Sequence, residues 1–234
     1  MTSSTTSAEP SSTPSETRGR WALTAWLAIA AIQIALGFSA GASDSDSADT
    51  PFYHYRFTVA ALIIYAILIG LTLWIGSAYA DPRRALGLVR FRPRWLGAAA
   101  AVVVVASALA AALEPVLHAG EEQGLAPDAW EPSNAIPFAI NALIAETLVP
   151  FAEELFFRGA GVTVLRPFGA AAALLGTAII FGLAHGILVA LPVLVVLAVG
   201  LAWMRDRSES VWPSVTAHAA YNGVAVVALY VSLQ

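Results

Sequence analysis

Four ionisable side chains interrupt long apolar stretches of this sequence: Glu153, Glu154, His185 and His218. In a membrane-crossing segment a charged group costs roughly 2.5 to 3.5 kcal/mol on insertion scales, so such residues usually face a cavity and have a function. Carboxylates and imidazoles are also the side chains that most often act as general bases and acids. This combination predicts acid–base chemistry at a site inside a membrane.

Spacing separates the roles of the two adjacent carboxylates. Glu154 and Arg158 are four residues apart, so on a helix they share one face and can form a supporting ion pair. Glu153 points about 100° away on the same helix and can project into a pocket. The same spacing of four places His218 and Asn222 on one helix face.

Three segments, in this order, resemble the motifs of the type II CAAX prenyl endopeptidases and their bacterial relatives, the CPBP intramembrane proteases. The motifs are Glu-Glu-x-x-x-Arg, Phe-x-x-x-His and His-x-x-x-Asn. Here they read Glu153-Glu154 with Arg158, Phe181 with His185, and His218 with Asn222. Trp212-Pro213-Ser214 also resembles the family's lead-in to the last motif. The resemblance covers residues 134–222, which is less than half of the chain.

The resemblance implies a peptidase in which a glutamate and a histidine activate water while a second histidine and an asparagine stabilise the oxyanion. The catalytic residues would be Glu153, His185, His218 and Asn222, supported by Glu154 and Arg158. Physical chemistry agrees, because burial in a low dielectric makes a carboxylate a stronger proton acceptor. Imidazole and amide N–H groups can stabilise an oxyanion without a metal.

A zinc enzyme is the competing chemical interpretation. Two histidines and one glutamate form a known catalytic ligand set, so Zn²⁺ could be held by Glu153, His185 and His218. The same residues serve a metal-free mechanism equally well, and we favour that mechanism, with no cofactor. The family is often called a metalloprotease family.

Composition indicates that membrane-crossing helices position these residues. Of 234 residues, 58% are apolar and only 12% are charged, so most of the surface must face something other than water. A helix needs about 20 apolar residues to cross the hydrocarbon core. We therefore predict an all-α, polytopic transmembrane bundle of about seven spans. The predicted spans are Trp21–Ala40, Phe57–Ala80, Trp95–Leu113, Ala135–Leu165, two helices within Phe168–Met204 that turn near Gly186 and Pro192, and Val211–Leu233.

The spans suggest a division of the chain into a disordered tail (1–20), three leading helices with their loops (21–132) and a four-helix protease core (133–234). Depths counted at 1.5 Å per residue from the inner border place Glu153, His185, His218 and Asn222 roughly 18, 25, 10 and 16 Å into the membrane. These depths allow the four residues to meet in one cavity between the inner leaflet and the middle of the bilayer.

The N-terminal residues are rich in Ser, Thr and Pro and have almost nothing to bury, which favours disorder. A cleaved signal peptide is the rival interpretation, because Ser39–Ala42 offers small residues after an apolar run. That run is longer than the usual 7 to 15 residues of a signal core.

Charge asymmetry predicts the orientation. All twelve basic residues are arginine; eleven fall on one side of the predicted spans and only Arg56 on the other. The positive-inside rule therefore predicts a cell-membrane protein with its N-terminus in the cytoplasm and its C-terminus outside. The acidic residues Asp44, Asp46, Asp49, Glu121, Glu122, Asp128 and Glu131 then lie in outer loops. Arginines this close to a bilayer are explained by topology and anionic lipid, so no nucleic-acid partner is expected.

The function predicted is endoproteolysis of a peptide or membrane-associated protein. The chain contains no cysteine, which excludes disulfides and thiolate chemistry. Alternatives are a non-enzymatic membrane partner or bacteriocin self-immunity protein that retains the motifs, and a proton-coupled transporter, although no internal repeat supports a transporter. Histidine and asparagine can also simply tie membrane helices together. Glu146, seven residues before Glu153, either supports the site or is bonded within the bundle.

Overall fold

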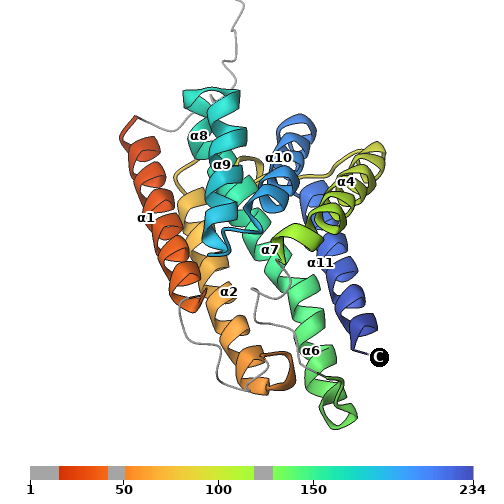
Figure 1. Ribbon diagram of the computed structural model, residues 1–234. Helices are drawn as coiled ribbons and strands as arrows, with labels where there is room; N and C mark the ends of the chain where they lie inside the picture. Colours follow the sequence, from red (N-terminus) through yellow and green to blue (C-terminus); the bar gives the residue numbers. More distant parts are fainter. Residues whose placement is uncertain (1–15, 42–50, 119–128, 234) are drawn as a thin grey trace, which may run out of the picture.

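The computed structural model describes residues 16–41, 51–118 and 129–233, and every regular element in these ranges is a helix. In chain order the elements are α1 Glu16–Gly41, η1 Pro51–Tyr53, α2 Tyr55–Gly76, α3 Pro82–Ala85, α4 Arg94–Leu117, η2 Pro132–Asn134, α6 Ala135–Glu146, α7 Leu148–Glu154, η3 Leu155–Gly161, α8 Val162–Leu165, η4 Arg166–Phe168, α9 Ala170–Ala184, α10 Leu191–Ser208 and α11 Trp212–Ser232. The predicted fold class, an all-α transmembrane bundle of about seven spans, is confirmed (Figure 1).

Among the described residues, five helical stretches are long and apolar enough to cross a membrane: Gly19–Ser39, Tyr55–Gly76, Arg94–Leu117, Pro132–Phe168 and Trp212–Ser232. The shorter helices α9 and α10 make up the other two of the predicted seven. At 15 residues, α9 is only about 22 Å long, less than the roughly 30 Å of a hydrocarbon core. The expected turn between these two helices is present and begins directly after α9, at His185.

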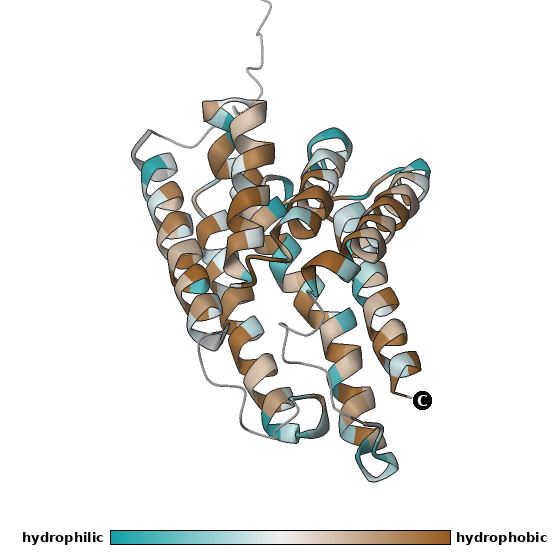
Figure 2. Ribbon diagram, in the orientation of Figure 1, coloured by the Kyte–Doolittle hydropathy of each residue, from teal (hydrophilic) through white to brown (hydrophobic). Residues whose placement is uncertain are grey.

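The lipid-facing surface follows from hydropathy. Figure 2 shows hydrophobic residues along most of each helix, with hydrophilic residues at helix ends and near α7 in the middle of the bundle. On α2, for example, Ile63, Ile64 and Ile67 are 54%, 58% and 56% exposed. Within a bilayer these side chains contact lipid, and the helical backbone satisfies its own hydrogen bonds.

The predicted border of the N-terminal tail was wrong over its last five residues. Residues 16–20 belong to α1, because a helix can continue past the apolar segment into residues such as Glu and Arg that have good helix propensity. The rest of the predicted tail, residues 1–15, lies outside the described residues. So do most of the predicted outer-loop acids, at positions 44, 46, 49, 121, 122 and 128.

The fourth predicted span is not one regular helix. It breaks at Thr147, where φ is −124° and ψ is −65°, and continues as α7 and then as the π-helix η3. Pro150 explains the break, because it has no N–H to donate to the carbonyl of Glu146, one turn earlier. π-helical turns are frequent at functional sites, and here the π-helix follows Glu154 directly.

Helix α1 packs against this irregular segment. Trp26 is fully buried, its ring stacks on Phe156 with 5.6 Å between ring centroids, and its Nε1–H donates to the Phe156 carbonyl over 3.1 Å. Gly161 leaves room for the contact, since a Cβ at that position would lie 2.7 Å from the Trp26 ring. The first predicted span thus holds the helix that carries the acidic residues.

The connection between α2 and α4 is held against the ends of α10 and α11. Arg205 donates from Nη2 to the Ala85 carbonyl over 3.0 Å, and the Val211 N–H donates to the Gly87 carbonyl over 2.9 Å. The α2–α4 connection therefore packs beside the start of α11.

Candidate active site

A fully buried ion pair lies at the centre of the polar network. Arg158 Nη1 is 2.9 Å from Glu154 Oε1, and both side chains are 0% exposed. Arg158 Nη2 also donates to the Ala198 carbonyl of α10 over 3.2 Å. The guanidinium carbon lies 4.4 Å from the centroid of the Phe181 ring. The i,i+4 spacing brings the pair together, and contacts to α9 and α10 hold it in place.

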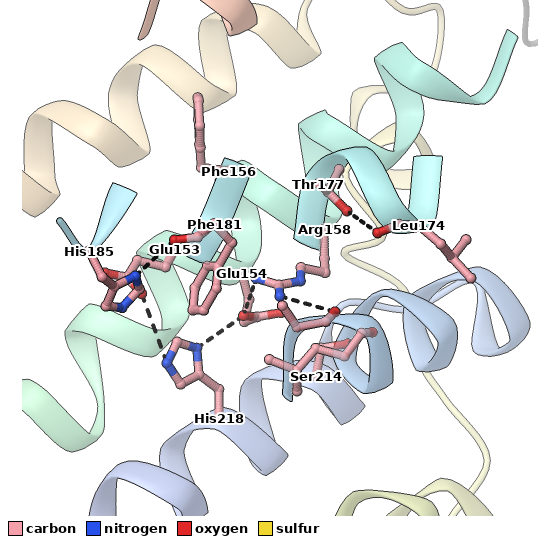
Figure 3. A network of polar contacts seen from close by, with 12 residues as sticks. Glu153, Glu154, Phe156, Arg158, Leu174, Thr177, Phe181, His185, Ser214 and His218 are labelled. Atoms are coloured by element: carbon pink, nitrogen blue, oxygen red, sulfur yellow. Dashed lines mark hydrogen bonds and ion pairs between the residues drawn. The ribbon is translucent and has the colours of Figure 1, made fainter. Parts of the chain in front are cut away.

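Glu154 also orients His218. Its Oε1 lies 3.0 Å from His218 Nδ1, and His218 is 3% exposed. A carboxylate paired with arginine only accepts hydrogen bonds, so Nδ1 of His218 carries a proton. Nε2 then points away from Glu154 and lies 3.9 Å from Glu153 Oε2 (Figure 3). That distance is too long for a direct hydrogen bond.

The two oxygens of Glu153 have different surroundings. Oε1 accepts a hydrogen bond from the Tyr65 hydroxyl of α2 over 3.2 Å. Oε2 is buried and has no hydrogen-bond partner among the described residues. One carboxylate oxygen is therefore held, and the other is available beside an imidazole nitrogen.

His185 caps the C-terminal end of α9. Its Nδ1 is 2.8 Å from the Phe181 carbonyl, so Nδ1 is the donor and Nε2 is free. The Phe181 ring lies 4.6 Å from the His185 ring and 5.5 Å from the His218 ring, between centroids. Figure 3 shows both imidazoles beside the Phe181 ring, which also contacts Arg158. The family resemblance left open which histidine acts with Glu153, and in the structure His218 Nε2 lies 3.9 Å from Glu153 Oε2.

The turn after His185 requires glycine. Gly186 has a φ of +71°, and a Cβ on this residue would lie 2.2 Å from the Gly37 carbonyl oxygen of α1. Only glycine combines this backbone conformation with such a close approach. The α1–α9 contact thereby fixes the end of the helix that carries His185.

Asn222 lies one turn beyond His218 on α11, as its spacing predicts. Its Nδ2 donates to the Ala145 carbonyl over 2.9 Å, at the end of α6 just before the helix break. Glu146 lies nearby, because a Cβ on Gly223 would be 3.8 Å from the Glu146 carboxyl carbon. Asn222 therefore links α11 to α6, and one of its two amide N–H groups remains for another acceptor.

The zinc alternative does not fit this arrangement. Within the described ranges, no group of three His, Asp or Glu side chains converges so that it could hold a metal ion.

Sequence reasoning missed Tyr65, because it belongs to no motif. Its position was the available signal: tyrosines of membrane proteins gather near the interfaces, yet Tyr65 lies at the middle of α2, which spans Tyr55–Gly76. A mid-span phenol that is not exposed needs a hydrogen-bond partner, and here that partner is Glu153.

A surface groove of about 800 Å³ lies at the end of the bundle that carries the α2–α4 connection. It is lined by Asp81, Arg83, Leu88, Val89, Arg90, Phe91 and Trp212. Trp212 begins α11 and stacks on Phe151 of α7, with 5.7 Å between ring centroids. Phe151 precedes Glu153 by two residues, so the groove adjoins the helix that carries the acidic residues.

Fold and site together define a multi-pass, all-helical membrane protein with a buried glutamate–histidine network. Residues 135–224 match the family model described as type II CAAX prenyl endopeptidase Rce1-like. The matched region contains Glu153, Glu154, Arg158, His185, His218 and Asn222. The family resemblance of the sequence is thus confirmed, and this family is a family of proteases. No curated protein and no solved structure shows a significant match to the chain.

Proposed function

We propose that this protein is an intramembrane endopeptidase in which Glu153, assisted by His218, activates water without a metal. One observation carries the proposal. Glu153 Oε2 is buried, has no hydrogen-bond partner among the described residues, and lies 3.9 Å from His218 Nε2. Two unoccupied acceptor atoms at this separation suit a nucleophilic water.

A water molecule fits between Glu153 Oε2 and His218 Nε2. If the water oxygen lay about 2.8 Å from both atoms, the angle at the water oxygen between them would be about 90°, close to the angle between the two O–H bonds of water. Such a water donates one hydrogen to Oε2 and one to Nε2. Its lone pairs are then free to attack a peptide carbonyl.

The proposed reaction conserves its atoms and charge. Glu153 takes a proton from water as hydroxide adds to the carbonyl carbon, giving a tetrahedral oxyanion. The C–N bond then breaks, and the proton passes from Glu153 to the leaving amine. His185, through its free Nε2 when protonated, and the remaining N–H of Asn222 are the proposed oxyanion donors.

The Glu154–Arg158 pair supports this chemistry by holding His218. A hydrogen bond from Nδ1 to a fixed carboxylate sets the tautomer and orientation of the imidazole. With the ring held in this way, Nε2 faces Glu153 Oε2 at 3.9 Å and can share the proton during turnover. Glu154 and Arg158 are therefore supporting residues that act through His218.

The proposed substrate is a peptide or a membrane-associated protein that reaches the site from the cytoplasm. The Arg-containing loops gather at the end of the bundle with the α2–α4 connection, which supports a cell-membrane protein with a cytoplasmic N-terminus and an external C-terminus. Arg158 does not count toward this charge bias, because it is buried in the network. The groove at Trp212 opens at the same end and supports substrate approach from that side.

The test is cleavage by the purified full chain in liposomes. The probes are quenched fluorescent peptides ending in a CAAX sequence, with and without a farnesyl group on the cysteine. Glu153→Gln preserves size and hydrogen bonding but removes the base, so cleavage should fall by about 10² to 10⁴. The control Glu209→Gln changes an exposed carboxylate and should cleave like the wild type.

Two results would contradict the proposal. If no probe is cleaved, and membranes containing wild type or Glu153→Gln yield the same peptide termini by mass spectrometry, the protein is not an endopeptidase. A non-enzymatic membrane partner or self-immunity protein would then account for any phenotype that Glu153→Gln retains. Stoichiometric metal in the purified protein, together with loss of cleavage in chelator, would refute the metal-free mechanism.

A further inference from the structure

Tyr65 reaches the proposed base from a helix outside the family match. The matched region is 135–224, whereas Tyr65 belongs to α2, which packs along α6, α7 and η3. Its hydroxyl donates to Glu153 Oε1 over 3.2 Å. Helix α2 therefore contacts the Glu153 carboxylate directly.

This hydrogen bond determines which oxygen of Glu153 is available. A carboxylate without a fixed partner can rotate about its terminal bond, where the torsional preference is broad. With Oε1 held by Tyr65, Oε2 is the oxygen that faces His218 Nε2 at 3.9 Å. A donor on one oxygen and an imidazole opposite the other fix the plane of the carboxylate.

We infer that Tyr65 is a positioning residue for Glu153, so that the site is completed by α2 as well as by the four-helix region. The inference rests on the proposed function, because it assigns Glu153 Oε2 as the atom that accepts the proton. Tyr65 itself neither exchanges a proton nor touches the substrate. Its effect is to keep Oε2 aligned with the water shared with His218.

A purely structural role makes a different prediction. If the phenol only satisfied its own hydrogen-bonding group inside the bundle, removing the hydroxyl would change stability and leave the chemical step intact. A positioning residue instead affects the chemical step, because the misaligned carboxylate reaches the transition state less often. Comparing the effect on kcat with the effect on thermal stability therefore separates a positioning role from a purely structural one.

The kinetic experiment compares Tyr65→Phe with Tyr79→Phe in the liposome assay. Tyr79 is half-buried and packs against the same hydrophobic core as Tyr65, so it is a matched control. Loss of a hydrogen bond to a charged group predicts a fall in kcat of roughly 10- to 100-fold for Tyr65→Phe. KM and the unfolding temperature should stay within error of the control. An unchanged kcat, or a lower kcat matched by lower thermal stability, would overturn the inference.

A second experiment tests the juxtaposition without any substrate. The cysteine-free chain permits the pair Tyr65→Cys and Glu153→Cys, treated with a short bis-methanethiosulfonate cross-linker. The control pair replaces Ile64, which is 58% exposed and points away, in place of Tyr65. The first pair should cross-link and the control should not. Equal cross-linking of the two pairs would refute the contact between positions 65 and 153, even if the wild-type protein cleaves its probe.

Together, the two experiments distinguish a failure of the positioning role from a failure of the proposed function. If wild type cleaves its probe and Tyr65→Phe is unaffected, the positioning role is refuted and the proposed function stands. If wild type cleaves nothing while the 65–153 pair cross-links, the proposed function fails although the contact is real, and the positioning role of Tyr65 fails with it.

Discussion

Replacing Arg158 with methionine removes the positive charge at the centre of the network but keeps an unbranched, though shorter, side chain. The substitution takes away the 2.9 Å contact with Glu154 and the hydrogen bond to the Ala198 carbonyl. Glu154 is 0% exposed, and Arg158 is the only arginine paired with it in the part of the chain that the structure describes. We therefore expect a large loss of stability.

The magnitude follows from the burial of both partners. Removing one member of a buried ion pair costs about 3 to 5 kcal/mol, because the other charge is left uncompensated. For a chain of this size, each kcal/mol corresponds to roughly 2 to 4 °C in the unfolding temperature. Arg158→Met should therefore lower the unfolding temperature by about 6 to 20 °C.

A second substitution tests whether the stranded charge is the cause. Adding Glu154→Gln to Arg158→Met removes that charge and should recover most of the lost stability, since apolar or neutral replacements of whole buried pairs are often tolerated. The matched control is Arg166→Met, which breaks the ion pair with Asp206. The Arg166 side chain is 48% exposed, so this change should cost no more than about 1 kcal/mol.

Tryptophan fluorescence during heating in detergent, checked by gel filtration, measures all four proteins. Wild-type stability in Arg158→Met would refute the supporting role of the ion pair. A double variant less stable than Arg158→Met would show that the loss comes from packing or from the Ala198 contact, and not from the stranded carboxylate.

Three further predictions follow from single sites. Asn222→Ala should leave slow but measurable cleavage, reduced by about 10² to 10³ as for other oxyanion donors; full activity would remove Asn222 from that role. Gly186→Ala should lower folded yield, because its Cβ would meet the Gly37 carbonyl at 2.2 Å. Gly70→Ala, which meets nothing within 4 Å, is the matched control. In intact cells an impermeant thiol reagent should label Ala129→Cys and not Arg92→Cys; the reverse pattern would invert the proposed orientation.

The helices and the local pairing within them could be predicted from the amino-acid sequence. Charge-free runs of about 20 residues predict membrane-crossing helices whatever their neighbours are, because backbone hydrogen bonds must be satisfied inside each segment. The spacing of Glu154 and Arg158 likewise predicts their contact, since it depends only on helical geometry. The ordered motifs around His185 and His218 were sufficient to identify the family. The sequence did not predict the helix break at Thr147 or the helical conformation of residues 16–20.

The sequence could not predict which helices meet at the acidic residues, because that depends on how the helices pack. Helical spacing says which side chains share a face of one helix, but it carries no information about the face of another helix that packs against it. Tyr65 lies 88 positions from Glu153 in the chain, and the contact exists because α2 packs along α7. For the same reason, the sequence did not predict that His218, held by Glu154, would be the imidazole facing Glu153, or that Asn222 would bond to the Ala145 carbonyl.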